Sequence, residues 1–167
     1  DPLPDPDLPY PAREEFYNEK GDYNRRIKER KYYKDGALHR VLLQNADPNL
    51  PYPAQEWFRN QPGVYDQRIW MINYYKNDLF HREPLPNADP NLPYPAKEEF
   101  YKEKGDYKRR IKERTYYKNG ALHRDPLPDP NLPYPAVETF CNFGGGKSEE
   151  RIQTRNYYKD GALHRVL

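Results

Sequence analysis

The sequence is poor in the residues that build most globular cores. Of 167 residues only 29 are Leu, Ile, Val or Phe, and there is one Met, one Cys and two Trp. So low an aliphatic content is typical of disordered chains when the net charge is high. Here the net charge is only +2, and 17 Tyr supply large side chains that can be buried. We therefore expect an ordered, thin, tyrosine-rich protein without a deep core.

The same shortages exclude several classes of protein. The single Cys141 rules out an internal disulfide, and the longest aliphatic run, residues 41–43, is too short to span a membrane. Basic and acidic residues are balanced at 28 against 26, which argues against nucleic acid as a partner. Because no acid–base pair or Ser-His-Asp arrangement is unique to one part of the chain, we expect no enzyme and no cofactor.

Internal repetition organises the whole chain. The motif Leu-Pro-Tyr-Pro-Ala recurs with its Ala at positions 12, 54, 96 and 136, and a Phe follows four residues after each Ala. Each copy closes on a motif of the form Tyr-Tyr-Lys-Asp-Gly-Ala-Leu-His-Arg. We divide this single array into copies at residues 1–42, 43–84, 85–124 and 125–167. The chain opens without Met, inside a linker, so we expect a segment of a longer array or a processed chain.

Each copy is predicted to form three antiparallel strands. In copy one these are residues 12–17, 26–34 and 37–40, with turns at residues 19–22 and at Asp35-Gly36. The Pro-rich segment that precedes each first strand is expected to run as a polyproline-like linker across the sheet or along its edge. A helix over residues 13–30 is the alternative, but the Gly in mid-segment and the absence of an apolar stripe disfavour it. The fold class is therefore an all-β, elongated array of antiparallel hairpins with Pro-rich linkers.

The two-residue turn at Asp35-Gly36 fixes the register of the hairpin. It pairs Lys34 with Ala37, Tyr33 with Leu38, and Tyr32 with His39. Alternation then predicts one face that is a buried seam running from copy to copy, and an opposite face that carries a ladder of Tyr, His and Arg. The seam comprises Ile27, Tyr33 and Leu38, and the opposite face comprises Lys28, Arg30, Tyr32 and His39.

These motifs resemble a known type of repeat. A strand ending in Tyr-Tyr-Lys-Asn/Asp-Gly-x-Leu-His-Arg, followed by Pro-Ala and another aromatic strand, is similar to the hairpin repeats of the MORN type. It is most similar to the variant in the bacterial YwqK family of antitoxin or immunity proteins. The resemblance implies a β-hairpin array that inhibits or binds another protein. A fainter similarity, to choline- and glucan-binding hairpin repeats, implies a carbohydrate-binding surface.

Two groups of residues are candidates for partner binding. The first recurs in every copy, and the second lies in copy two, which departs most from the repeat and where Trp and Met are concentrated as in interface cores. The recurring residues are Tyr32, His39, Arg40, Tyr74, His81, Arg82, Tyr116, His123, Arg124, Tyr157, His164 and Arg165. The copy-two residues are Trp57, Trp70 and Met71, for which a better-packed local core is the alternative.

The recurring His and Arg also have structural interpretations. Successive His lie a whole copy apart, too far for one tetrahedral metal site, and a cross-strand contact with Tyr is favoured. Each Arg follows its His beside the same aromatic, which favours stacking inside the array over contact with an acidic partner.

Two functions follow from this array. The first is a non-enzymatic scaffold for protein–protein interaction; the resemblance implies the immunity type, which would place it in the cytoplasm. The second is a structural segment of a self-assembling fibre, extracellular or on the cell surface, whose array ends join head to tail. A carbohydrate-binding surface repeat is a variant of the second.

Overall fold

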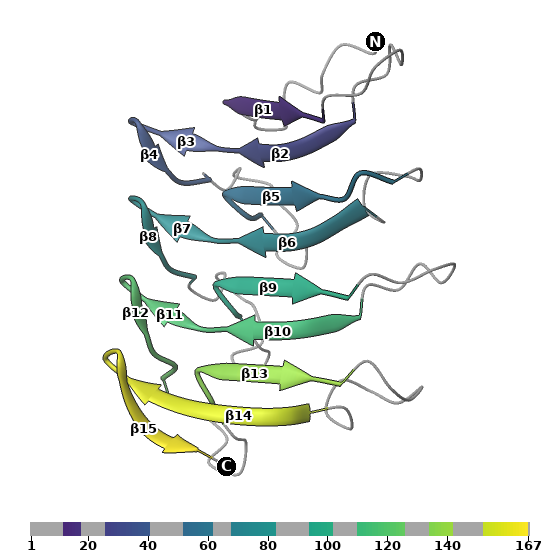
Figure 1. Ribbon diagram of the computed structural model, residues 1–167. Coiled ribbons are helices and arrows are strands. Elements are labelled where there is room, and N and C mark those ends of the chain that lie inside the picture. The colour runs from purple at the N-terminus through teal and green to yellow at the C-terminus, as the bar shows by residue number, and fades with distance from the viewer. Residues whose placement is uncertain are drawn as a thin grey trace.

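The protein is an all-β array of stacked antiparallel hairpins (Figure 1). The computed structural model describes residues 12–17, 26–40, 52–61, 68–82, 94–101, 110–125, 134–141 and 152–166. Within these ranges there is no helical element. The strands of copies one and two are β1 (Arg13–Phe16), β2 (Ile27–Lys31), β3 (Tyr33–Lys34), β4 (Ala37–Leu38), β5 (Gln55–Phe58), β6 (Ile69–Asn73), β7 (Tyr75–Lys76) and β8 (Leu79–Phe80). Those of copies three and four are β9 (Lys97–Phe100), β10 (Ile111–Thr115), β11 (Tyr117–Lys118), β12 (Ala121–Leu122), β13 (Val137–Phe140), β14 (Ile152–Lys159) and β15 (Ala162–Val166).

Nine of these strands form one continuous sheet, in the order β1-β2-β5-β6-β9-β10-β13-β14-β15. Each copy contributes two adjacent long strands, and the first strand of the next copy pairs antiparallel with the second strand of the copy before it. The array therefore grows along an axis that crosses the strands, from the purple end to the yellow end of Figure 1. The predicted turn at residues 19–22 and the predicted Pro-rich linkers lie outside the described residues.

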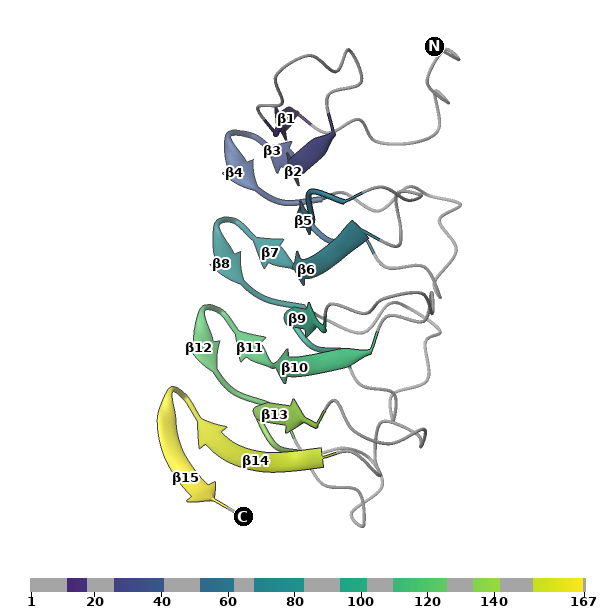
Figure 2. The same ribbon diagram turned by 45° about the vertical axis from the view of Figure 1, so that its right-hand side comes forward.

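The hairpins form a second column beside this sheet (Figures 1 and 2). The pairs β3–β4, β7–β8 and β11–β12 are separate two-stranded ribbons, whereas in copy four β14 runs on without a break and β15 joins the main sheet. The predicted register is confirmed, since Tyr33 lies opposite Leu38 and Lys34 opposite Ala37. Both turn residues, Asp35 and Gly36, have positive φ, as the tight turn requires. The expected three-stranded meander is thus correct for copy four, while in the other copies the third strand leaves the sheet.

A β-bulge lies near the start of the second strand of every copy. In copy one, Phe16 is opposite Ile27 and Glu15 is opposite Glu29, so Lys28 is the extra residue. The same register shift occurs next to Trp70, Lys112 and Gln153. The extra residue moves Ile27 onto the other face of the sheet relative to a strand of unbroken alternation.

The core lies on one face of the sheet, which we call the core face. Its central cluster comprises Phe58, Ile69, Ile72, Tyr74 and Phe100, with Ile27 and Ile111 packed against it. Full burial of a side chain such as Phe58, which is 0% exposed, contributes roughly 1.5–3 kcal/mol.

The prediction that Ile27, Tyr33 and Leu38 form a buried seam on one face is wrong. Tyr32 is buried at 6% exposure and Tyr33 is exposed at 38%. The bulge at Lys28 places Ile27 on the core face, and the strand breaks at Tyr32, whose N–H donates to the Ala54 carbonyl of the next copy over 2.9 Å. Tyr33 and Leu38 instead pair with each other in the hairpin column.

Candidate protein-binding surface

The recurring His side chains connect one hairpin to the next. His81 Nδ1 accepts the Asn119 backbone N–H at 3.2 Å, and His123 Nδ1 accepts the Asp160 N–H at 3.3 Å. The donor in each case is the first turn residue of the following copy. The His123 ring also lies between two carboxylates, with Nδ1 3.1 Å from Asp160 Oδ1 and Nε2 3.0 Å from Asp125 Oδ1. In copy one the His39 Nδ1 has no hydrogen-bond partner among the described residues, and burial and then the charges of Lys34 and Lys76 hold the pKa of His39 below its ordinary value.

The recurring Arg side chains stack on Tyr rings inside the array. The guanidinium carbons of Arg40, Arg82 and Arg124 lie 3.9, 3.8 and 4.0 Å from the ring centroids of Tyr32, Tyr74 and Tyr116. Two of them also reach forward, because Arg40 donates to the Pro53 carbonyl at 3.4 Å and Arg82 to the Pro95 carbonyl at 3.3 Å. Arg40 and Arg82 thus join their own hairpins to the Pro-Tyr-Pro-Ala segment of the next copy, and Arg124 reaches the next copy at Glu138 Oε2, 3.9 Å away.

The Tyr rings under these Arg side chains are themselves buried. Tyr32, Tyr74 and Tyr116 are 6%, 7% and 4% exposed. The Tyr116 hydroxyl donates to Glu138 of the next copy at 3.2 Å, and burial raises the pKa of Tyr116 above its ordinary value although the nearby Arg124 charge acts to lower it. In these copies the Tyr-His-Arg residues therefore carry contacts between copies, and they offer little surface to a partner.

Copy four presents the same residues differently. Tyr157 is partly exposed and meets the Tyr134 ring edge-on at a centroid distance of 6.1 Å. His164 is exposed, and the side chain of Arg165 lies outside the described residues. Leu163 is also exposed, at 57%. The ladder predicted from the sequence is thus most open in copy four, whereas His39, Arg40, Arg82, His123 and Arg124 are half-buried.

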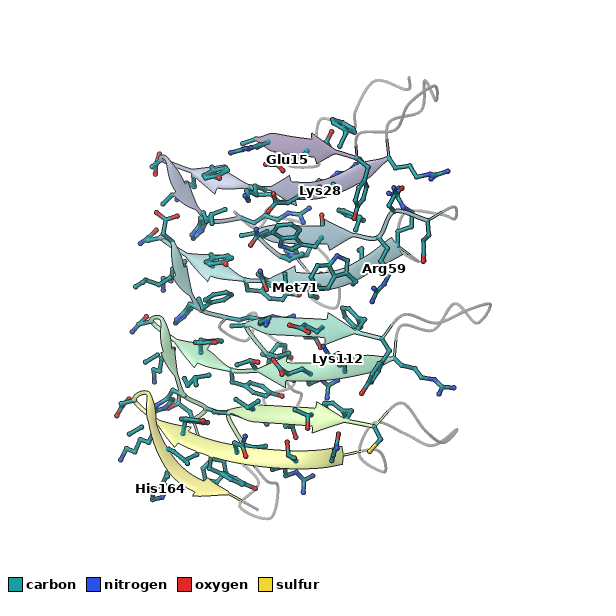
Figure 3. All side chains as sticks on the ribbon, in the orientation of Figure 1. Glu15, Lys28, Arg59, Met71, Lys112 and His164 are labelled. Atoms are coloured by element: carbon teal, nitrogen blue, oxygen red, sulfur yellow. The ribbon has the colours of Figure 1, made fainter. Side chains whose placement is uncertain are left out.

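The second group of candidates comes together on the face of the sheet that is opposite the core face. We call it the front face (Figure 3). Trp57 on β5 lies directly opposite Met71 on β6. The bulge brings Trp70 to the same side, where the two indole centroids are 6.2 Å apart with their planes at 53°. All three side chains are partly exposed. We call Trp57, Trp70 and Met71 the indole patch.

The neighbouring copies carry charged residues where copy two has the indole patch. The corresponding positions hold Glu15, Lys28 and Glu29 in copy one and Glu99, Lys112 and Glu113 in copy three. In copy four they hold Thr139, Gln153 and Thr154. The patch is therefore an apolar interruption in an otherwise polar face.

A buried polar network supports one side of the patch. The Asn73 side-chain amide donates to Gln55 Oε1 at 2.9 Å, the Tyr75 hydroxyl donates to the same oxygen at 3.3 Å, and Gln55 donates to Glu29. Burial, followed by lesser contributions from its neighbours, raises the pKa of Tyr75 to about 12, so the hydroxyl stays protonated and able to donate. The network fixes β5 and β6 beneath the indole rings.

Arg59 also borders the indole patch, and the sequence analysis did not name it as a candidate. Its guanidinium lies 5.9 Å from the Trp70 ring and donates to the Phe100 carbonyl of copy three at 2.7 Å. The signal was present, because copies one and three have Tyr17 and Tyr101 at this position. Tyr17 and Tyr101 donate to the equivalent carbonyls of their following copies, those of Phe58 and Phe140.

Two further features of the described chain bear on the class of site. Among its residues no group of three or more His, Cys, Asp or Glu is arranged to hold a metal ion. No helix among those residues is long and apolar enough to cross a membrane.

Comparison with known proteins returns no match: no family model, no curated protein and no solved structure is similar to this chain. The resemblance to MORN-type and YwqK repeats stays a prediction from the motifs. The described structure gives the fold class of the protein, which is an all-β array of antiparallel hairpins.

Proposed function

We propose that this protein is a non-enzymatic repeat scaffold that binds another protein through the indole patch of copy two. The observation that carries the proposal is the partial exposure of Trp57, Trp70 and Met71 together on one face. Aromatic residues and Met are enriched where protein surfaces meet, and such anchors commonly supply most of the binding energy. An inhibitor of the immunity type would use such a surface.

The rigidity of the surface supports the same proposal. β5 and β6 lie inside the nine-stranded sheet, with a paired strand on either side. The core face of the same strands holds the best-packed cluster, including Phe58 and Ile72 at 0% and 3% exposure. Side chains held in place before binding lose less conformational freedom when a partner docks.

The test compares two variants that introduce the same residue types. Trp57→Thr, Trp70→Gln and Met71→Thr together give copy two the front-face residues of copy four. The matched control makes Glu99→Thr, Lys112→Gln and Glu113→Thr in copy three. A partner captured by the wild-type chain should bind the copy-two variant at least about tenfold more weakly, a loss of about 1.4 kcal/mol or more. The control should bind nearly as the wild type does.

Circular dichroism melting of both variants checks that the sheet has been kept. Equal binding of the partner to the wild type and to a folded copy-two variant would show that the indole patch is a local packing feature only.

A further inference from the structure

The Glu side chains that border the indole patch are already paired within the protein, and the Arg59 guanidinium beside Trp70 donates to the Phe100 carbonyl. Each Glu on the front face of copies one and three lies within 3.8 Å of a Lys or Arg side-chain nitrogen. Burial acts to raise the pKa of Glu99, but hydrogen bonds from Lys97 and Lys112 outweigh it and hold that pKa below its ordinary value. Glu99 therefore stays ionised and paired. A face of paired charges exerts a weak field, so the occupant of the patch is selected by apolar contact rather than by charge.

The two indole rings are tilted rather than stacked. With planes at 53° and centroids 6.2 Å apart, they leave an open angle between ring faces. A proline ring is rigid and apolar and costs little side-chain entropy to immobilise. Aromatic-lined surfaces bind extended Pro-rich segments in this way, exploiting a polyproline II helix that is already formed in the free chain.

Backbone hydrogen bonding at the patch is compatible with this occupant and not with an added β-strand. β5 is paired on both sides, with β2 and β6, and β6 is paired with β5 and β9. No strand edge is therefore free under the patch for a β-strand from a partner. The indole N–H of Trp57 is covered and has no hydrogen-bond acceptor within the described part of the chain. A polyproline II segment has unpaired carbonyls along its whole length.

The repeat distance of the array also matches this occupant. Neighbouring strands lie about 4.8 Å apart, so one copy of two strands advances by about 9.6 Å. A polyproline II helix has three residues per turn and advances about 9.3 Å per turn. A Pro-rich segment laid across the strands would therefore place every third residue over the same position of successive copies.

From these observations we infer that the partner segment is a Pro-rich chain in the polyproline II conformation, which crosses β5 and β6 along the array axis with a proline ring between Trp57 and Trp70. The inference rests on the proposed function and names the chemistry of the partner.

Fluorescence of the two Trp residues tests the inference directly, because the chain has no other Trp. The full chain is titrated with a blocked decaproline peptide, and in parallel with a blocked Gly-Ser peptide of equal length, an amphipathic helical peptide and cellohexaose. We expect a saturable change in emission with decaproline alone. Calorimetry should then show decaproline binding weakened at least about tenfold by the copy-two variant and nearly unchanged by the copy-three control.

The other outcomes separate this inference from the proposed function. Saturable binding of the helical peptide but not of decaproline would overturn the polyproline inference while supporting a protein-binding patch. Binding of cellohexaose alone would overturn both and favour a carbohydrate-binding surface. No response to any probe would overturn the polyproline inference, and the protein-binding proposal would then be decided by partner capture with the two variants.

Discussion

At the residue scale, the motif His-Arg links adjacent copies in two different ways. The imidazole accepts an N–H from the next hairpin, as His81 does from Asn119. The guanidinium covers its own Tyr ring and reaches the next Pro-Tyr-Pro-Ala segment, as Arg82 does with Tyr74 and Pro95. The imidazole contact joins copy two to copy three and copy three to copy four, whereas the His39 Nδ1 of copy one has no hydrogen-bond partner among the described residues.

The His contact predicts a measurable difference between two equivalent positions. His81→Leu should lower the free energy of unfolding by about 1 kcal/mol, because it removes the hydrogen bond that the buried imidazole accepts from the exposed Asn119 N–H. His164→Leu is the matched control, since His164 is exposed. Urea denaturation of the two variants measures the difference. Equal destabilisation by both would mean that the imidazole contributes to its own hairpin and not to the next.

At the element scale, the hairpins were predictable and the bulges were not. A two-residue Asp-Gly or Asn-Gly turn determines its own register, and the pairing of Tyr33 with Leu38 is confirmed. Nothing local in Ile27-Lys28-Glu29 distinguishes a bulged strand from one of unbroken alternation, so the faces of that strand were predicted wrongly. The break at Tyr32 depends on a hydrogen bond to the next copy, which no local pattern contains.

The candidate surface was predictable for a different reason. Trp57, Trp70 and Met71 stand out because copy two departs from its neighbours, and sequence comparison between copies is enough to find them. Their assembly depends on the bulge, since unbroken alternation would place Trp70 and Met71 on opposite faces. Arg59 was missed although copies one and three have Tyr17 and Tyr101 at this position, because sequence comparison between copies shows the difference and not the contact with Trp70.

The stacked hairpins predict a second measurable difference, between two turn glycines. Gly36 and Gly120 both have φ of +83°, so Ala at either position should cost about 1–2 kcal/mol of stability through backbone strain. A Cβ at Gly36 meets nothing within 4 Å, whereas one at Gly120 comes within 3.2 Å of Leu79 Cδ2 in the preceding hairpin. We therefore expect Gly120→Ala to lower the urea midpoint more than Gly36→Ala. The opposite order would show that adjacent hairpins do not pack closely in solution.

At the scale of the whole molecule, the question is whether the open ends of the array join. At the copy-four end β15 pairs with β14, and Val166 lies opposite Asn156. This is the place that the first strand of a following copy takes elsewhere, as Val137 does opposite Thr115. The chain's own β15 therefore covers the Asn156 end of the edge that a second molecule would need, while β15 does not pair with Thr154 or Arg155 of β14. At the other end the exposed edge strand, β1, has only four residues.

We accordingly expect a monomer rather than the fibre that the repeat pattern also suggested. Light scattering on a sizing column should give a mass near 20.1 kDa that stays constant over a wide range of concentrations. Heterologous contacts between array ends would instead extend without closing, so species that grow with concentration would contradict this expectation. In that case a variant that ends after residue 161, and so lacks β15, should assemble more strongly than the full chain. Assembly that is unaffected by removal of β15 would place the contact elsewhere, with the indole patch as the next surface to examine.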